Sequence, residues 1–351
     1  MPPILMHLPT HSNLETKRLA TVYALPDLAV FEVSGADAVS FLQGQITNDI
    51  AGAPLGIARL AGYCTPQGRL LATMVLSHTT SRDDESPVLH GIIKRDILTP
   101  VLKRLSMFVM RAKAKFSETQ RVVRGISLQS GDIAEFEALI GCRLPVTVWE
   151  KTDTAEGTWI TAPSNGLLRW WLISDADQAI AVDALLSHCS VGKVQDWHAL
   201  DVVEGLPWIQ AAIQDLFIPQ TLNLDLIQGV SFTKGCYPGQ EIVARSHYRG
   251  TLKRRMVAAI VAQPQDNGLA GNSSGAALQA LLPGADIYDG SRTDQVCGRI
   301  INAAITDDKT YLLIESSFEA VDHAMLRASS ADGPALTVQS MPYVVRPEPQ
   351  E

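Results

Sequence analysis

Between residues 234 and 241 the chain reads Lys234-Gly235-Cys236-Tyr237-Pro238-Gly239-Gln240-Glu241, a single thiol in a turn rich in glycine and proline. Pro238-Gly239 suits the two central positions of a type II turn, because proline presets φ and glycine accepts the positive φ. Gly235 gives the backbone a second permissive point just before the thiol. The sequence therefore predicts that Cys236 lies at a chain reversal near the protein surface.

Charges of both signs surround this thiol. Lys234 would favour the thiolate, and a helix that begins at Gln240 would add the field of its N-terminus. Glu241 opposes that effect, but on a helix it can pair with Arg245 four residues later. These features favour a functional Cys236. The alternative is an ordinary tight turn whose cysteine is only a small side chain.

Length and composition indicate a soluble globular protein. A chain of 351 residues with 46% hydrophobic side chains is expected to form two or three domains. No apolar run approaches the ~18 residues that span a bilayer, so we expect no membrane partner. The start of the chain lacks a basic region and an apolar core, so residues 1–18 are interpreted as a loose leader rather than a secretory signal.

The five cysteines of the chain are far apart in sequence. No CxxC pair and no Cys/His cluster with zinc spacing occurs, so we expect no metal site. A reducing, cytoplasmic location fits this usage. Four of the cysteines are interpreted as small buried side chains: Cys64, Cys142, Cys189 and Cys297. No heptad repeat requires association, and a monomer is expected.

The net charge of −8 argues against broad, non-specific nucleic-acid binding. One local exception is a basic run with a single aromatic residue. It could bind an anionic ligand tail, a partner or an RNA backbone, or it could be a solvated face. Its members are Arg245, His247, Tyr248, Arg249, Lys253, Arg254 and Arg255.

Hydrophobic periodicity predicts an α+β architecture: two α+β units of similar size, followed by a small all-β barrel. The first unit is expected over about 19–118 and the second over about 119–255, with the two units either consecutive or interleaved. The barrel is expected over 256–351, with a flexible insertion at 263–284. The strands are expected at 28–34, 58–64, 70–77, 88–93, 122–128, 146–149, 159–161, 167–173, 256–261, 285–288, 295–304, 311–315 and 336–338, and the helices at 36–43, 97–108, 133–140, 178–189 and 196–204.

The segment 234–241 resembles the signature of the YgfZ-type folate-binding proteins, relatives of the glycine-cleavage T-protein. Further similar stretches are Phe41 to Asp49, Gly205-Leu206-Pro207, Phe217 to Gln220, Asn223, Gly229 to Phe232, Arg245 and Gly250. The resemblance implies a ring of three domains, two of them ferredoxin-like, with a C-terminal β-barrel. It implies a reduced folate such as tetrahydrofolate in the central hole. It also implies a role in iron–sulfur cluster assembly or repair for client enzymes, including those that thiolate tRNA.

The residues proposed for the folate site follow from their chemistry and from this resemblance. Trp197 matches a tryptophan that some relatives place beside folate, and an indole can stack on a pterin; the alternative is core packing. Arg245 and Arg249 suit the glutamate carboxylates of the ligand. The polar side chains after Gly44 suit a pocket lining or, alternatively, a capped loop. The predicted folate-site residues are Gln45, Thr47, Asn48, Asp49, Trp197, Lys234, Tyr237, Gln240, Glu241 and Arg245, with Cys236 as the functional thiol.

The sequence departs from the T-protein at two places. Where that family carries a catalytic acidic pair, this chain has Ala72 and Thr73. Where it carries a pterin-binding glutamate, this chain has Val203, and Glu204 follows one position later, about 100° further round a helix. Both departures favour a binding or repair protein over an enzyme. The alternative is a tetrahydrofolate-dependent aminomethyl transferase that uses Asp49 or Glu241. A third hypothesis is direct tRNA binding by the 245–255 run.

Overall fold

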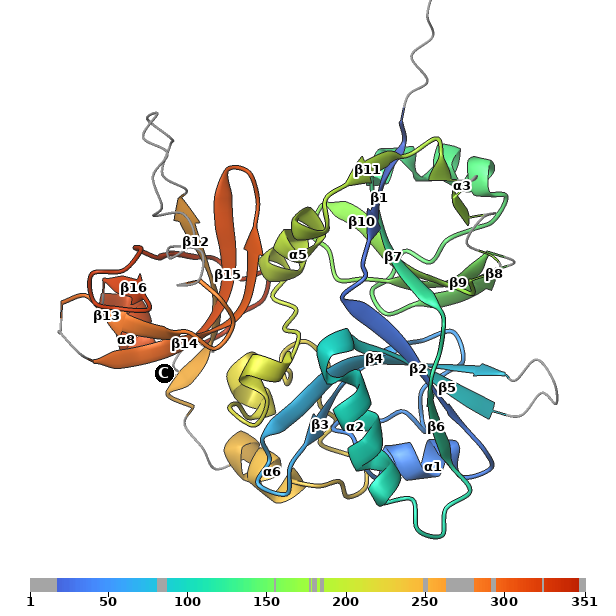
Figure 1. Cartoon of the computed structure of the whole chain (residues 1–351), viewed down its shortest axis with the longest axis horizontal. Coiled ribbons are helices and arrows are strands. Elements are labelled where there is room, and N and C mark those ends of the chain that lie inside the picture. Colours follow the sequence, from blue (N-terminus) through green and yellow to red (C-terminus); the bar gives the residue numbers. More distant parts are fainter. Residues whose placement is uncertain are drawn as a thin grey trace, which may run out of the picture.

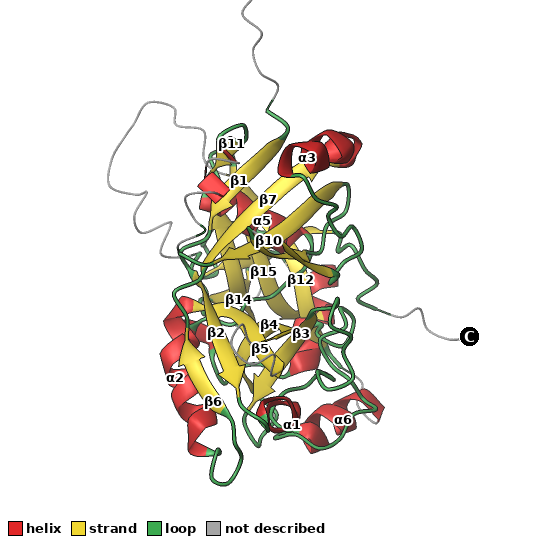
Figure 2. Cartoon of the chain, turned by 90° about the vertical axis from the view of Figure 1, so that its right-hand side faces the viewer, coloured by secondary structure: helices red, strands yellow, loops and turns green. Residues whose placement is uncertain are grey.

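The computed structural model places the chain in three β-sheets with helices packed on them (Figure 1). It describes residues 18–80, 87–154, 156–176, 178, 182–183, 186–248, 252–262, 281–291, 295–323 and 325–346. Figure 2 shows the first two sheets stacked end to end, with the third behind them. The predicted α+β architecture is confirmed as a combination of helices and sheets, with a separate β-sheet formed by the C-terminal part of the chain.

The first sheet has the strand order β3-β4-β5-β2-β6, all antiparallel. Its strands are β2 (Leu28–Ser34), β3 (Arg59–Cys64), β4 (Leu70–Thr80), β5 (Pro87–Lys94) and β6 (Lys115–Glu118). Helices α1 (Ala38–Gln43) and α2 (Arg95–Met107) belong to this unit. The helix α2 buries one stripe of apolar residues, Ile97, Leu98, Val101, Leu102 and Leu105, at the spacing that an amphipathic helix requires.

The second sheet has the order β11-β1-β7-β10-β9-β8. Its strands are β1 (Ala20–Ala24), β7 (Val122–Gln129), β8 (Lys151–Thr154), β9 (Gly157–Thr161), β10 (Leu167–Ser174) and β11 (Ser190–Gly192), with α3 (Ile133–Ile140) beside them. The strand β1 precedes the whole first sheet in sequence, yet pairs with β7 and β11. The two sheets are therefore interleaved along the chain.

The third sheet has the order β16-β13-β14-β15-β12-β17. Its strands are β12 (Arg254–Ala262), β13 (Asp286–Asp289), β14 (Val296–Ile305), β15 (Lys309–Ser317), β16 (Leu326–Ala328) and β17 (Thr337–Gln339), with α8 (Phe318–His323). In this order β16 and β17 form the two edges, so the expected barrel is a curved sheet (Figure 1).

Helix α5 (Val194–Val203) links the second and third sheets. Gly205 follows its C-cap, and the φ of +63° at Gly205 fits the predicted helix stop. The fully buried Arg169 of β10 donates to Asp201 of α5 over 2.6 Å, and the indole of Trp208 donates to the other Asp201 oxygen over 3.0 Å. Asn302 of β14 pairs with the backbone N–H and C=O of Trp208. One buried polar network thus joins β10, α5 and the third sheet.

Most predicted elements agree with the structure, and strand 28–34 and helix 133–140 agree to the residue. The strand predicted at 146–149 is wrong, because Trp149 has a φ of +72°; the strand of this region is β8. The prediction lacks the short strands β1, β6, β11 and β16 and the helix α8. Residues 179–181 and 184–185 of the predicted helix 178–189, and residues 263–280 of the predicted insertion, lie outside the described residues.

Replacing Asp201 with Asn should destabilise the protein by about 3 kcal/mol or more, because the Arg169 charge would be left buried without a counter-ion. Urea unfolding followed by circular dichroism measures this. The control is Asp307→Asn, which breaks the exposed ion pair with Lys193 and should leave the stability nearly unchanged. Equal losses in the two variants would contradict a special role for the buried pair.

Candidate functional site

The thiol-bearing turn has the predicted geometry. Gly239 has a φ of +81°, helix α6 (Gln240–Tyr248) begins at Gln240, and Cys236 is exposed. A Cβ on Gly239 would lie 2.5 Å from Gly68 Cα, so this turn packs closely on the β3–β4 turn of the first sheet. Tyr237 is 7% exposed, and burial raises the pKa of its phenol. The Tyr237 ring packs into the protein, and the thiol beside it faces solvent.

Lys234 anchors this turn to the loop after α1. Its ammonium donates to the carbonyls of Gln43, Ile46 (2.7 Å) and Asn48 (3.1 Å), and it lies 5.2 Å from the centre of the Tyr237 ring. Burial lowers the pKa of Lys234 to about 8. We expected the Lys234 ammonium to favour the Cys236 thiolate, but its N–H groups donate to these three carbonyls. The contacts of Lys234 therefore hold the turn in place.

Polar side chains of the 45–49 segment bind backbone groups. Thr47 Oγ1 donates to Gly229 O over 2.6 Å and accepts from Gly62 N over 2.8 Å. Asn48 Nδ2 donates to Leu60 O (2.7 Å) and Gln228 O (2.6 Å). The Asp49 carboxylate accepts from Gln43 Nε2 and Gly52 N. These contacts match the capped-loop alternative for Thr47, Asn48 and Asp49; Gln45 is half-buried nearby.

Trp197 is fully buried in the aromatic core. The Arg169 guanidinium lies 4.1 Å from the centre of its ring, and the rings of Tyr23 and Trp171 lie 5.5 Å and 6.3 Å away. A Cβ on Gly125 would meet the indole at 2.3 Å. No face of Trp197 is free for a pterin, contrary to the expectation that it stacks on the ligand.

The first turns of α6 are open to solvent. Glu241 and Arg245 are exposed and Gln240 is half-buried. Within the part of the chain that the structure describes, Glu241 and Arg245 form no ion pair, so the expected pairing is absent there. Arg249 lies outside the described residues.

The 245–255 run is less cationic than its sequence indicates. Arg254 makes a two-bond contact with the Glu315 carboxylate, at 2.6 Å and 2.9 Å. Arg255 does the same with Asp225, at 2.9 Å and 2.8 Å, and both partners are nearly buried. Two of the cations expected to attract RNA are therefore neutralised.

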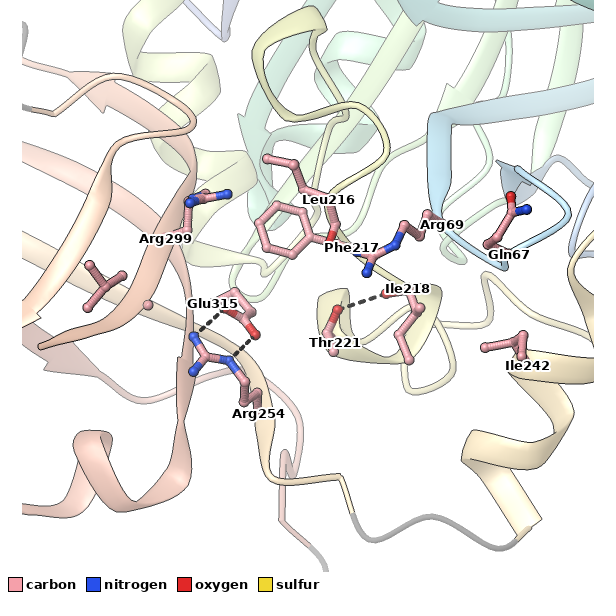
Figure 3. Close-up of a pocket in the computed structure, with 12 residues that line it drawn as sticks. Gln67, Arg69, Leu216, Phe217, Ile218, Thr221, Ile242, Arg254, Arg299 and Glu315 are labelled. Carbon is pink, nitrogen blue, oxygen red and sulfur yellow. Dashed lines mark hydrogen bonds and ion pairs between the residues drawn. The ribbon is translucent and has the colours of Figure 1, made fainter.

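A cavity of about 420 Å³ lies where the first sheet, α6 and the third sheet meet (Figure 3). Its apolar lining comes from Leu216, Phe217, Ile218, Ile242 and Val296. Its charged lining comes from Arg69, Arg254, Arg299 and Glu315. Arg69 donates to Leu216 O over 2.7 Å and makes no ion pair with a described residue, whereas Arg299 pairs with Asp286 at 2.7 Å.

This cavity is the candidate binding site. Gln67 of the β3–β4 turn and Ile242 of α6 line it, and both flank the contact between Gly68 and Gly239. None of the side chains predicted for the folate site lines it. The sequence analysis did not identify Arg69 and Arg299 as site residues, because they are far apart in the chain and only the fold brings them together. Of the charged lining residues it identified only Arg254, as part of the basic run.

The two positions that depart from the T-protein have structural roles. Thr73 Oγ1 donates to Pro207 O over 3.1 Å and accepts from Ile209 N over 3.0 Å, and both Ala72 and Thr73 are fully buried. Glu204 Oε1 accepts from Asn165 N over 2.7 Å. Neither place holds a carboxylate directed at the cavity.

Among the described residues, no group of three or more His, Cys, Asp or Glu side chains could hold a metal ion. In the same part of the chain, no helix is long and apolar enough to cross a membrane.

The fold is that of the aminomethyltransferase class. The structure aligns with the glycine cleavage system aminomethyltransferase T from Bartonella henselae over 95% of this chain and 88% of that chain, with a TM-score of 0.66 and 15% identity. The sequence is 32% identical to the tRNA-modifying protein YgfZ of Klebsiella pneumoniae strain 342 over 238 residues, 67% of this chain and 70% of that protein. It is 34% identical to YgfZ of Edwardsiella ictaluri strain 93-146 over 246 residues, 67% and 70% of the two chains. The chain belongs to the YgfZ family. No family model matches it.

Replacing Lys234 with Met should destabilise the protein by about 1–3 kcal/mol, because three backbone carbonyls lose their donor. The same change at the exposed Arg245 should cost less than about 0.5 kcal/mol. Urea unfolding of the two variants makes the comparison. If Lys234→Met left the free energy of unfolding unchanged, the Lys234 contacts would contribute nothing to stability.

Proposed function

We propose that this protein binds a reduced folate, tetrahydrofolate or a close relative, and supports the assembly or repair of iron–sulfur clusters in client enzymes. Such clients would include radical enzymes that thiolate tRNA, which fits the name tRNA-modifying protein that its relatives carry. The protein would act in the cytoplasm as a monomer that contacts its clients transiently. Membership of the YgfZ family and the aminomethyltransferase fold support this proposal.

The observation that carries the folate proposal is the cavity between the first and third sheets. Its volume of about 420 Å³ falls within the usual range of roughly 300–1,000 Å³ for small-molecule sites. A folate combines flat apolar rings with an anionic glutamate tail. The apolar lining suits the rings, while guanidinium groups bind carboxylates through paired hydrogen bonds.

The position of each charge suggests how the ligand would lie. Glu315 neutralises Arg254, so Arg254 shapes the wall more than it attracts an anion. Arg69 makes no ion pair with a described carboxylate. Arg299 shares its charge with Asp286, which is one-third exposed. We therefore assign the glutamate carboxylates to Arg69 and Arg299, and the rings to Phe217 and its apolar neighbours.

Cys236 is the functional thiol of this proposal. It is exposed and its turn packs on the wall of the cavity. The nearest histidine in sequence, His247, stacks on Phe232 with ring centres 3.7 Å apart. That contact favours a thiol that binds a client's cluster, or exchanges with it, over a nucleophile activated by a positioned base.

The aminomethyl-transferase alternative needs a carboxylate to move a proton at the substrate nitrogen. Thr73 and Ala72 stand where the catalytic pair would be, and the Asp49 carboxylate is already bonded to Gln43 and Gly52. Glu241 is exposed on α6. No observation favours this alternative, and we do not propose it.

Calorimetric titration with tetrahydrofolate should show binding that weakens about tenfold or more in Arg69→Ala and in Arg299→Ala, because each loses a charge-assisted carboxylate contact. Tetrahydropterin, which lacks the glutamate, provides the control ligand: its affinity should be unchanged in both variants. Wild-type protein that binds no reduced folate would overturn the proposal. If neither arginine substitution changed the affinity for tetrahydrofolate, the ligand would bind outside this cavity.

Replacing Cys236 with Ala should abolish support of cluster-dependent tRNA thiolation in cells while leaving the melting temperature within about 1 °C, because the side chain is exposed. The readout is the thiolated-nucleoside content of bulk tRNA. The matched control is Cys142→Ala, a second cysteine that is not fully buried. Unchanged thiolation in the Cys236 variant would remove this residue from the mechanism.

A further inference from the structure

The loop between α2 and β6 projects from one end of the molecule. Figures 1 and 2 both show it beyond the ends of α2 and β6, away from the second sheet. Three large apolar side chains on it face solvent: Met107 is 63% exposed, Phe108 52% and Met110 88%. No other described stretch places three such side chains within four residues.

Cations flank these apolar side chains on both sides. Lys103 on α2, Arg111 in the loop, and Lys113 and Lys115 leading into β6 are all exposed. Residues 103–117 contain no Asp or Glu, in a chain whose net charge is −8. Within the described residues, none of these four cations forms an ion pair with a carboxylate. We name the segment 103–115 the cationic tip.

The cationic tip is held in shape by its base. Asp37 Oδ2 accepts from Lys113 N over 2.7 Å, while Asp37 N donates to Lys113 O over 3.1 Å. The Asp37 carboxylate contacts the tip through this backbone N–H, and it forms no ion pair with a described cation. A Cβ on Gly35 would lie 2.2 Å from Lys113 O, so only glycine allows this close approach. The tip is thus preorganised, which lowers the entropic cost of binding.

We propose that the cationic tip binds single-stranded RNA, such as an RNA loop. Three of its four exposed cations are lysines, a residue that is depleted at protein–protein interfaces but that contacts phosphates readily. Phe108 between the cationic flanks offers an aromatic face on which a base can stack, as in other single-strand binding sites. A lipid surface would need more apolar area than one short loop supplies for stable attachment.

This proposal does not rest on folate binding, because the tip and the cavity share no residue. It moves the nucleic-acid contact away from the 245–255 run, whose Arg254 and Arg255 are paired with carboxylates. It also accounts for a strongly acidic protein reaching a polyanion, because contact would be limited to a narrow projecting loop.

The test is fluorescence anisotropy with the full-length protein, a labelled tRNA transcript and a labelled twelve-nucleotide RNA. The triple variant Lys103→Gln/Lys113→Gln/Lys115→Gln should bind both RNAs at least tenfold more weakly at 100 mM salt. The slope of log affinity against log salt should fall by about 2, near 0.7 for each lost phosphate contact. Phe108→Ala should weaken binding at least fivefold with its salt slope unchanged, because stacking carries no charge.

The matched control removes three exposed cations elsewhere, by Arg143→Gln/Lys193→Gln/Lys253→Gln, and should leave RNA affinity within twofold. Melting temperatures verify that every variant folds. The proposal is overturned if wild-type protein fails to bind either RNA at 50 mM salt. It is also overturned if the control triple loses as much affinity as the tip triple. Binding to phosphatidylserine vesicles without binding to RNA would assign the tip to a membrane surface instead.

Discussion

The turn that carries Cys236 depends on one contact: the Lys234 ammonium bound to the carbonyls of Gln43, Ile46 and Asn48. These groups are almost two hundred residues apart in sequence, so the contact closes a very long loop of chain. Thr47 and Asn48 strengthen it by bonding to Gly229 and Gln228 just before Lys234. Because the ammonium is partly desolvated, its three acceptors must stay in place, which fixes the turn that carries Cys236.

The sequence predicts local structure correctly where the backbone preferences of single residues or a regular apolar pattern determine it. Pro238-Gly239 and Gly205 determined a turn and a helix stop, and the apolar stripe of 97–105 determined α2. The role of Lys234 could not be predicted, because three backbone carbonyls leave no trace in the side-chain pattern. The failure at 146–149 has a local cause as well: Trp149 adopts a left-handed φ that its residue type does not indicate.

Charge in the sequence proved a poor guide to charge on the surface. The 245–255 run has several cations, yet Arg254 and Arg255 each face a carboxylate contributed by a distant segment. The cationic tip has a similar density of cations and no described counter-ion. The difference arises from topology: a buried strand such as β12 must neutralise its charges, whereas a projecting loop can leave them to solvent. Similarly, Trp197 is core because Arg169 covers its face.

The cavity wall and the turn that carries Cys236 meet at two glycines. A Cβ on Gly239 would lie 2.5 Å from Gly68 Cα, so the two turns are in direct backbone contact. Gly68 is flanked by Gln67 and Arg69, which line the cavity, and Gly239 lies three residues after Cys236. A ligand that draws the Arg69 guanidinium inward would therefore press on the turn that presents the sulfur. Since packed backbones transmit small displacements rather than absorbing them, occupancy of the cavity and exposure of the thiol are expected to be coupled in both directions.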